Sequence, residues 1–228
     1  MDKVIDKYLN DLEKEEFLNI ISLVYNHKEF KRRNTNEFLH HSDITLSNHI
    51  IEVACLSYLK GKKLQKKDKT FNLKACVLIA MMHDLYCIPW QNNDEARVKH
   101  FSNKHGFRHP LEAVINAITW FPELFDDDKQ STIIIDGIIH HMYPLGVRVL
   151  SNHMELKNEN DLKNIDKKYI EIIKKSTNRF KLFHLSFAHS KFKEGRVVSI
   201  CDKKVSIRQI KNIYSLTSLI TGNNKSIK

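Results

Sequence analysis

Apolar residues recur every three or four positions through most of this chain, which predicts a largely helical fold. Residues 3–27 predict one or two packing helices that carry no chemistry. Further helices are predicted from Ser42 or Asp43 to Lys60, from Asn72 to His83-Asp84, from His109 through Ile118, from Ser131 to His141, and onward from about Arg196. Residues 146–196 show no clear period.

Residues 75–82 form an uninterrupted apolar run and predict a helix that is buried on nearly all sides. The run ends at His83 and Asp84, which places an imidazole beside a carboxylate in an apolar setting. Burying such groups is unfavourable by several kcal/mol unless each has a partner. A bound cation would satisfy both side chains at once, so this pair is the clearest indication of a metal site.

Other single ligand-type side chains lie in similar apolar settings, namely His49, His109, His141 and Asp202. A lone histidine on an apolar stripe is more often a hydrogen-bonded core residue than a ligand, and 13 histidines raise the rate of chance patterns. His140 adjoins His141, and either could be the ligand. We favour His141 because it shares a predicted helix face with Ile134 and Ile138.

The composition supports one helical domain in a reducing compartment. A chain of 228 residues can bury a sizeable core, and 6 Gly and 4 Pro favour helices over a turn-rich β sandwich. The 4 cysteines form no C-x-x-C pair, which favours buried, inert thiols. The N-terminus lacks an apolar signal core, and charged residues interrupt the longest apolar stretch. We therefore expect a soluble, cytoplasmic protein that does not enter a membrane.

The net charge of +10 comes mostly from lysines scattered through polar segments such as residues 62–67. Because no arginine-rich stripe alternates with aromatic residues, we expect no specific binding to nucleic acid. The lysines are interpreted as a solvated surface. The alternative is a positively charged surface around the entrance of a binding site, which would attract phosphorylated substrates.

The order His, His-Asp, His, His, Asp resembles the HD-domain superfamily of metal-dependent phosphohydrolases. The similarity is carried by residues 40–60, 81–85, 105–110, 141–145 and 200–203. These segments look like a bacterial subgroup that is usually described only as HD-domain proteins. The resemblance spans about residues 38–145 and 196–210, and it implies an all-α HD-type helical bundle with a metal site in its core.

The resemblance also implies a role for each matched position. A first metal ion would be held by His49, His83, Asp84 and Asp202. A second would be completed by His109 and His141, with Asp84 bridging the two ions. A water between the ions would be acidified and attack phosphorus while the cations neutralise phosphoryl charge. We thus expect two divalent transition-metal ions, and mixed ligation of this kind allows iron, manganese, zinc, cobalt or nickel.

Further residues near these positions are candidates for catalysis or substrate binding. Lys203, beside Asp202, could act with His83 and Asp84 by orienting a phosphate, or it could point to water. His105 and Arg108 could bind substrate phosphate or be ordinary surface residues.

We expect a single HD-type domain over residues 1–228, with its core at about 38–145 and 196–215. Residues 146–195 are then an insertion that could form a lid, a dimer contact or nothing functional. His184 and His189, spaced five apart within it, are expected to be structural or exposed.

These expectations favour a hydrolase that acts on a phosphoester or phosphoanhydride bond in a nucleotide or related metabolite. The expected partner is therefore a small phosphorylated molecule. The sequence is also compatible with a homo-oligomer. One alternative is a di-iron oxygenase of the same superfamily. Another is a non-catalytic binding module with a structural metal. The sequence contains no motif for binding a nucleobase or a sugar, so it does not identify the substrate.

Overall fold

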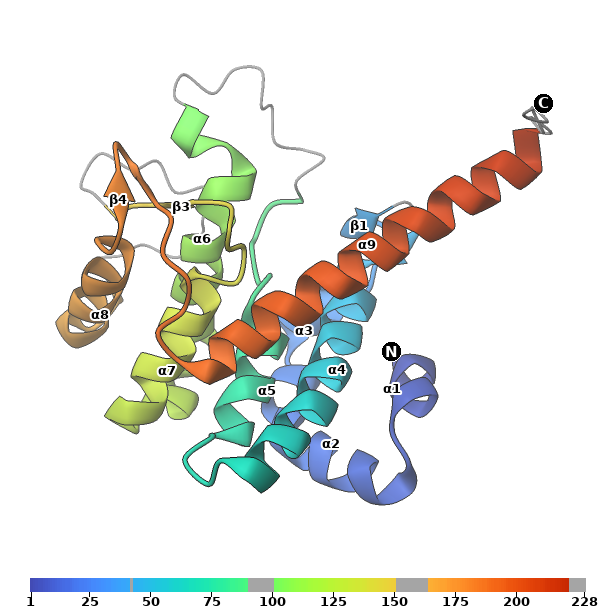
Figure 1. Cartoon of the computed structure of the whole chain (residues 1–228), viewed down its shortest axis with the longest axis horizontal. Helices are drawn as coiled ribbons and strands as arrows, with labels where there is room; N and C mark the ends of the chain where they lie inside the picture. The colour runs from blue at the N-terminus through green and yellow to red at the C-terminus, as the bar shows by residue number, and fades with distance from the viewer. Residues whose placement is uncertain (42, 90–100, 151–163, 222–228) are drawn as a thin grey trace.

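The computed structural model describes residues 1–41, 43–89, 101–150 and 164–221 as a bundle of helices with two small sheets (Figure 1). The earlier helices are α1 (Asp2–Tyr8), α2 (Asp11–Asn26), α3 (Lys28–Arg32), α4 (Leu46–Lys67) and α5 (Leu73–Met82). The later ones are α6 (His105–Trp120), α7 (Asp128–Ile139), α8 (Lys167–Thr177) and α9 (Lys193–Thr221). Short 3-10 turns lie at Phe101–Asn103 and Pro122–Phe125. The all-α prediction is confirmed.

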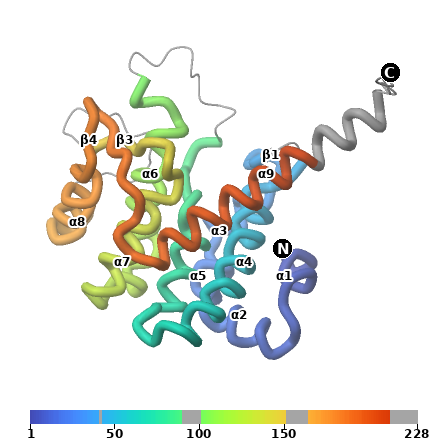
Figure 2. The backbone as a smooth tube through the Cα atoms, in the orientation of Figure 1, coloured from blue at the N-terminus to red at the C-terminus, as the bar shows by residue number. Residues whose placement is uncertain are grey.

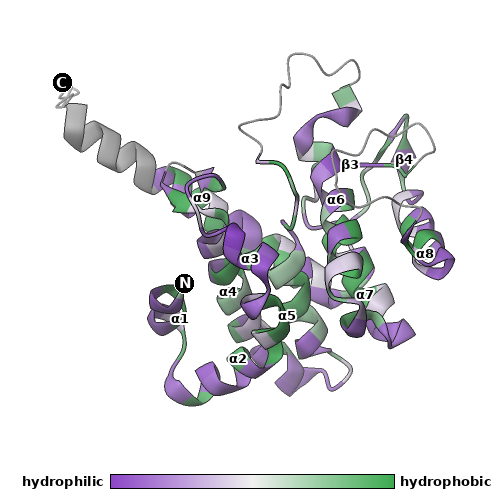
Figure 3. Cartoon of the chain, turned by 180° about the vertical axis from the view of Figure 1, so that it is seen from behind, coloured by the Kyte–Doolittle hydropathy of each residue, from purple (hydrophilic) through white to green (hydrophobic). Residues whose placement is uncertain are grey.

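Helix α5 lies in the core, where α2, α4, α7 and α9 pack against it. All of its residues except Lys74 are buried, and its apolar character stands out in Figure 3. Its start is fixed by Asn72, whose Oδ1 accepts a hydrogen bond from the backbone of Ala75 at 2.9 Å, as the sequence predicts. Burying each large apolar side chain contributes about 1.5–3 kcal/mol, so this packing holds the end of α5, and His83 after it, in place.

Helix α4 begins and ends later than the sequence predicts. Thr45 caps it instead of Ser42 or Asp43, because two strands come first, β1 (Leu39–His41) and β2 (Ile44–Thr45), which pair antiparallel. The helix also continues through Gly61 to Lys67. A Cβ at Gly61 would lie 2.7 Å from Leu73 Cδ1, so this glycine allows close packing and does not stop the helix.

Helix α6 begins one turn earlier than predicted, at His105, and Pro110 lies inside it. The extra turn is supported by a buried ion pair of 2.6 Å between Arg108 and Glu112, one turn apart. Helix α7 begins at Asp128 and is capped by Asp127. It ends at Ile139, which leaves His141 just beyond the helix.

The segment between α7 and α9 contains α8 and a three-stranded antiparallel sheet. Its strands are β3 (Val147–Arg148), β4 (Lys181–Leu182) and β5 (Leu185–Ser186), with β5 in the middle. The buried carboxylate of Asp136 connects this segment to α7. It accepts hydrogen bonds from Ser176, Arg179, Ser190 and the backbone of Lys191. His184 and His189 are exposed, as expected.

Helix α9 crosses the bundle and packs against α4, α5 and α7 (Figures 1 and 2). The crossing with α7 is close: a Cβ at Gly195 would lie 2.7 Å from the Cα of Gly137, so a larger residue would separate the helices. This approach brings Asp202 of α9 toward the ends of α5 and α7. Among the described residues, no helix is both long and apolar enough to cross a membrane.

Candidate metal centre

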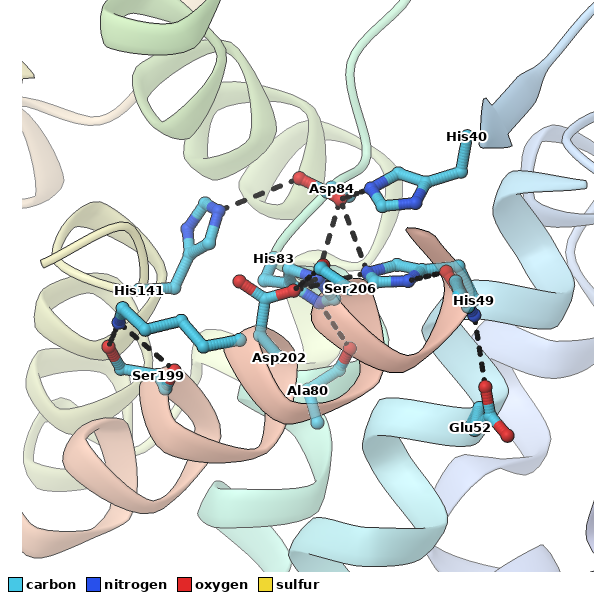
Figure 4. A network of polar contacts seen from close by, with 12 residues as sticks. His40, His49, Glu52, Ala80, His83, Asp84, His141, Ser199, Asp202 and Ser206 are labelled. Carbon is cyan, nitrogen blue, oxygen red and sulfur yellow. Dashed lines mark hydrogen bonds and ion pairs between the residues drawn. The ribbon is translucent and has the colours of Figure 1, made fainter. Parts of the chain in front are cut away.

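Six side chains that the sequence singled out converge in the core, where α4, α6 and α9 meet the ends of α5 and α7. All of them except His109 are labelled in Figure 4. They are His49 of α4, His83 and Asp84 after α5, His109 of α6, His141 after α7, and Asp202 of α9. All six are buried, with 0 to 6% of each residue exposed. The side chains come from distant parts of the sequence, so the helix packing assembles them.

One oxygen of Asp84 faces the first group of these side chains. Its Oδ2 lies 3.9 Å from Nε2 of His49 and 3.4 Å from Nε2 of His83. Asp202 closes the group, with Oδ1 at 3.2 Å from Nε2 of His49 and 3.9 Å from Nε2 of His83. These four side chains are the set that the resemblance assigns to a first ion.

The other oxygen of Asp84 faces the second group. Its Oδ1 lies 3.3 Å from Nε2 of His109 and 3.6 Å from Nε2 of His141. The two imidazole Nε2 atoms lie 3.1 Å from each other. Asp84 therefore stands between two groups of nitrogen atoms and presents one oxygen to each.

The opposite nitrogen of each imidazole faces a hydrogen-bond acceptor. The four contacts are His49 Nδ1 to Gln209 Oε1 at 3.1 Å, His83 Nδ1 to Ala80 O at 2.7 Å, His109 Nδ1 to His105 O at 3.0 Å, and His141 Nδ1 to Ile138 O at 2.7 Å. An acceptor at Nδ1 requires the proton on that atom. In each neutral ring Nε2 then carries a lone pair, and all four lone pairs face the cluster.

The cluster is consequently a set of electron-pair donors facing one another. In the second group, lone pairs on His109 and His141 meet at 3.1 Å beside a carboxylate oxygen. In the first group, the buried Nε2 atoms of His49 and His83 make no hydrogen bond within the described chain. Such an arrangement is repulsive unless protons or cations occupy it.

The distances match those that a metal ion requires. Ligand atoms about 2.1 Å from one ion lie about 3.0 Å apart at a right angle and about 3.4 Å apart at the tetrahedral angle. The pairwise distances given above, from 3.1 to 3.9 Å, are close to this range. The ligand atoms of His49, His83 and Asp202, and those of Asp84, His109 and His141, all lie within 4.8 Å of one another. The residues present therefore fit a bound divalent cation at each group.

The pKa values of the cluster show how it behaves without a cation. Burial alone would raise the pKa of Asp84, but His83, His109 and His141 hold it well below its ordinary value. Burial alone would lower the pKa of His109, and Asp84 raises it instead. Burial, together with the charges of His83 and His109, lowers the pKa of His141 to about 3. In the metal-free protein a proton therefore favours His109 over His141, and it would compete with a cation for that imidazole.

The backbone after Asp84 is held by two buried polar side chains. The guanidinium of Arg33 donates to the carbonyl oxygen of Tyr86, and the amide of Asn116 donates to that of Leu85 at 2.6 Å. Arg33 and Asn116 are both fully buried. The carboxylate between the two groups thus belongs to a rigid segment, which is what a bridging ligand needs.

The two adjacent histidines lie in different surroundings. His141 points to Asp84, whereas His140 points to α8, where its Nε2 lies 3.2 Å from Ser176 Oγ. Burial lowers the pKa of His140 to about 4. His140 therefore belongs to the Asp136 network and His141 to the cluster.

The predicted substrate-binding residues lie in different settings. His105 stacks on His109 with ring centres 4.9 Å apart, so it borders the second group. Arg108 is buried, and its guanidinium binds Glu112 and the carbonyl oxygen of Asn103. Contact between Arg108 and a substrate stays a prediction.

Lys203 is half-buried, and its ammonium donates to Ser199 at Oγ (2.6 Å) and at the carbonyl oxygen (3.1 Å). It forms no ion pair with any described carboxylate. The side chain lines a mostly apolar cavity of about 390 Å³ together with Tyr143, Pro144 and Ile200.

Two further residues at the cluster were missed by the sequence analysis. His40 of β1 stacks on His49 with ring centres 3.7 Å apart, and its Nε2 lies 4.0 Å from Asp84 Oδ2. Gln209 of α9 contacts Nδ1 of His49, the ring nitrogen that faces away from the cluster. His40 lies in a polar stretch without helical period, and its neighbour His41 is equally plausible by sequence. The only signal for Gln209 is its spacing of seven residues, two helical turns, from Asp202.

Comparisons with protein-family models, with curated proteins and with solved structures found no match to this chain. The fold and the cluster define a helical protein with a buried histidine and aspartate cluster that could bind metal.

Proposed function

We propose that this protein is a metal-dependent phosphohydrolase of the HD type. Its substrate is a phosphoester or phosphoanhydride of a nucleotide or related metabolite. The proposal rests above all on Asp84, whose two oxygens face two separate groups of metal-ligand atoms. A structural site needs one closed ligand shell, whereas paired open sites on a shared carboxylate are typical of hydrolytic centres.

When bound, a pair of divalent cations makes a water nucleophilic at neutral pH and neutralises the charge of a phosphoryl group. The chain's own residues supply the rigid frame for this chemistry. Buried Nδ1 contacts hold the four imidazoles, and the Arg33 and Asn116 bonds hold the segment of Asp84. Preorganised ligands of this kind need little rearrangement during the reaction.

Side chains beside the cluster are proposed to bind the substrate. His40, with 16% of its side chain exposed, and the half-buried His105 would donate hydrogen bonds to phosphoryl oxygens. Lys203 follows Asp202 directly and brings a positive charge that forms no ion pair with a described carboxylate. It would attract the anionic group while the neighbouring apolar cavity accommodates an organic part of the substrate.

Hydrolysis by purified protein, followed by chromatography of the nucleotide products and by assay of free phosphate, tests this proposal. The protein would be loaded with Mn²⁺ or Fe²⁺ and incubated with nucleotides, dinucleoside polyphosphates and cyclic dinucleotides. We expect turnover of at least one class, lost on chelation and restored by metal. Asp84→Asn should reduce it by more than about 100-fold, the upper range for partners that only support a ligand. Asp43→Asn, at an exposed turn, is the control and should retain it.

The two alternative functions give different results in the same preparation. Oxygen consumption by the iron-loaded protein, without hydrolysis of any of these substrates, would indicate the oxygenase. Bound metal without either reaction would favour a binding module with a structural metal.

A further inference from the structure

His49 differs from the other histidines of the cluster in what holds it. The Nδ1 atoms of His83, His109 and His141 face backbone carbonyls one turn earlier in their own segments. His49 Nδ1 instead faces a side chain, Oε1 of Gln209, which is 160 residues away in the sequence. The orientation of His49 therefore depends on a residue that a substitution can change.

Gln209 is buried, with 3% of the residue exposed. It follows Asp202 by seven residues, which places both on one face of α9. Asp202 approaches the Nε2 side of His49 and Gln209 approaches the Nδ1 side, at 3.2 and 3.1 Å. Helix α9 thus contacts both nitrogens of one imidazole.

The amide of Gln209 is oriented by Glu52, which lies one turn after His49 on α4. Gln209 Nε2 donates to Oε2 of Glu52 at 2.9 Å. The other oxygen of Glu52 accepts from the hydroxyl of Tyr8 at 2.5 Å and lies 2.7 Å from a guanidinium nitrogen of Arg208. These positive and donor groups favour the ionised form, and the pKa of Glu52 is lowered although burial opposes it.

An ionised carboxylate accepts hydrogen bonds and donates none. Glu52 therefore requires the NH₂ group of Gln209, which leaves the amide oxygen for His49. That oxygen in turn requires the proton of His49 on Nδ1. The order of donors and acceptors, from Glu52 to the imidazole, leaves the lone pair on Nε2.

We propose that Gln209, oriented by Glu52, is the positioning residue that fixes His49 in the tautomer able to bind a cation. This inference rests on the proposed metal centre. Partners of this kind commonly change metal affinity by about 10–100-fold when they are removed. The N-terminal helix α1 takes part through Tyr8, so it supports the same ligand from a distance.

Two measurements on Gln209→Met test the inference, since methionine has a similar length and cannot form either hydrogen bond. The first is the nitrogen-15 NMR spectrum of the histidine rings in metal-free protein, recorded at a pH where His49 is neutral. We expect the wild-type His49 to carry its proton on Nδ1 and the variant to show a mixture of tautomers. The second is titration with Co²⁺, in which one of the two ions should bind about 10–100-fold more weakly.

Glu52→Gln is the second variant, because it keeps the size of the side chain and removes the requirement on the amide direction. Like Gln209→Met, it should produce a mixture of His49 tautomers. It also keeps the test possible if Gln209→Met does not fold. Tyr58→Phe is the matched control. It removes another tyrosine hydroxyl that binds a glutamate, Glu16 at 2.8 Å, between α2 and α4, and it should change neither measurement.

A wild-type tautomer and unchanged cobalt affinities in folded Gln209→Met or Glu52→Gln would overturn the inference while leaving the metal centre intact. Wild-type protein that binds no cobalt would remove the metal centre and, with it, this role of Gln209. The NMR spectra would then show separately whether Gln209 still sets the tautomer.

Discussion

The two oxygens of Asp84 and the four Nε2 atoms around them are all electron-pair donors within a buried space. In each neutral ring the proton lies on Nδ1, where it is donated to an acceptor outside the cluster, so the Nε2 atoms carry no proton. Protons or cations must therefore occupy the cluster. The neighbouring residues His140 and His141 allow this to be tested one side chain at a time.

His141→Gln should lower the metal content by about one ion per chain, because His141, unlike His140, belongs to the second group. His140→Gln should leave the metal content unchanged, since His140 faces Ser176 and the Asp136 network. Metal analysis of both dialysed proteins measures the difference. Equal metal content in the two variants would contradict the assignment of the ligand.

Acidification should release the metal because protons compete with it for the imidazoles. Burial opposes protonation of His49, but Asp202 and Asp84 raise its pKa above the ordinary value of about 6.5. Competition should thus begin above this pH. Cobalt affinity should fall steadily from about pH 8 to about pH 5.5. A pH-independent affinity over this range would show that histidines are not the ligands.

The thermal stability of the metal-free protein should fall as pH rises above neutrality, whereas metal affinity should rise with pH. A raised folded-state pKa at His49 and His109 means that the native state binds these protons more tightly than the unfolded chain. Their stabilising effect is complete below about pH 6.5 and is lost as pH rises through the folded-state values. The Tm of metal-free protein should therefore fall between neutral and mildly alkaline pH. The His49→Gln, His109→Gln double variant should show a smaller fall.

At the scale of elements, two aspartates of α7 connect it to α8 in different environments. Asp136 is buried and binds Ser176 and Arg179, whereas Asp128 is exposed and forms a 3.3 Å ion pair with Lys168. Removing one partner of a buried ion pair is far more destabilising than removing an exposed one. The two positions therefore make a matched pair.

Asp136→Ala should lower the free energy of unfolding by about 3 kcal/mol, because Arg179 and several buried donors lose their acceptor. Asp128→Ala should lower it by less than about 1 kcal/mol. Urea denaturation measures both, and neither variant should lose metal. Similar stabilities for the two variants would contradict the structural role of the Asp136 network.

The sequence predicted the elements that depend on local signals. The apolar run and the Asn72 cap located α5, and the order of ligand-type residues identified all six members of the cluster. The start of α4 was predicted wrongly because the strand pair before it depends on contacts between β1 and β2. The Gly61 stop was wrong because the glycine serves packing against Leu73.

Contacts between distant segments account for what the sequence could not show. His40 reaches the cluster only because β1 folds beside the start of α4, and Gln209 only because α9 crosses α4. The role of residues 146–195 stays a prediction, and residues 151–163 lie outside the described part. The HD family and the hydrolase activity are proposals that the experiments above address.

At the scale of the whole molecule, the helices bring one carboxylate between two groups of histidines. Helix α5 ends beside Asp84, α4 and α9 supply the first group, and α6 with the end of α7 supplies the second. The interior of the bundle thereby holds two groups of side chains that could bind metal. The proposed function rests on this convergence.

Metal content tests this claim most directly. Wild-type protein saturated with Mn²⁺ or Co²⁺ and freed of excess should retain about two ions per chain. Asp84→Asn should retain close to none, and Asp43→Asn should match the wild type. A wild-type protein without bound metal under saturating conditions, or an Asp84→Asn variant that retains both ions, would contradict the account.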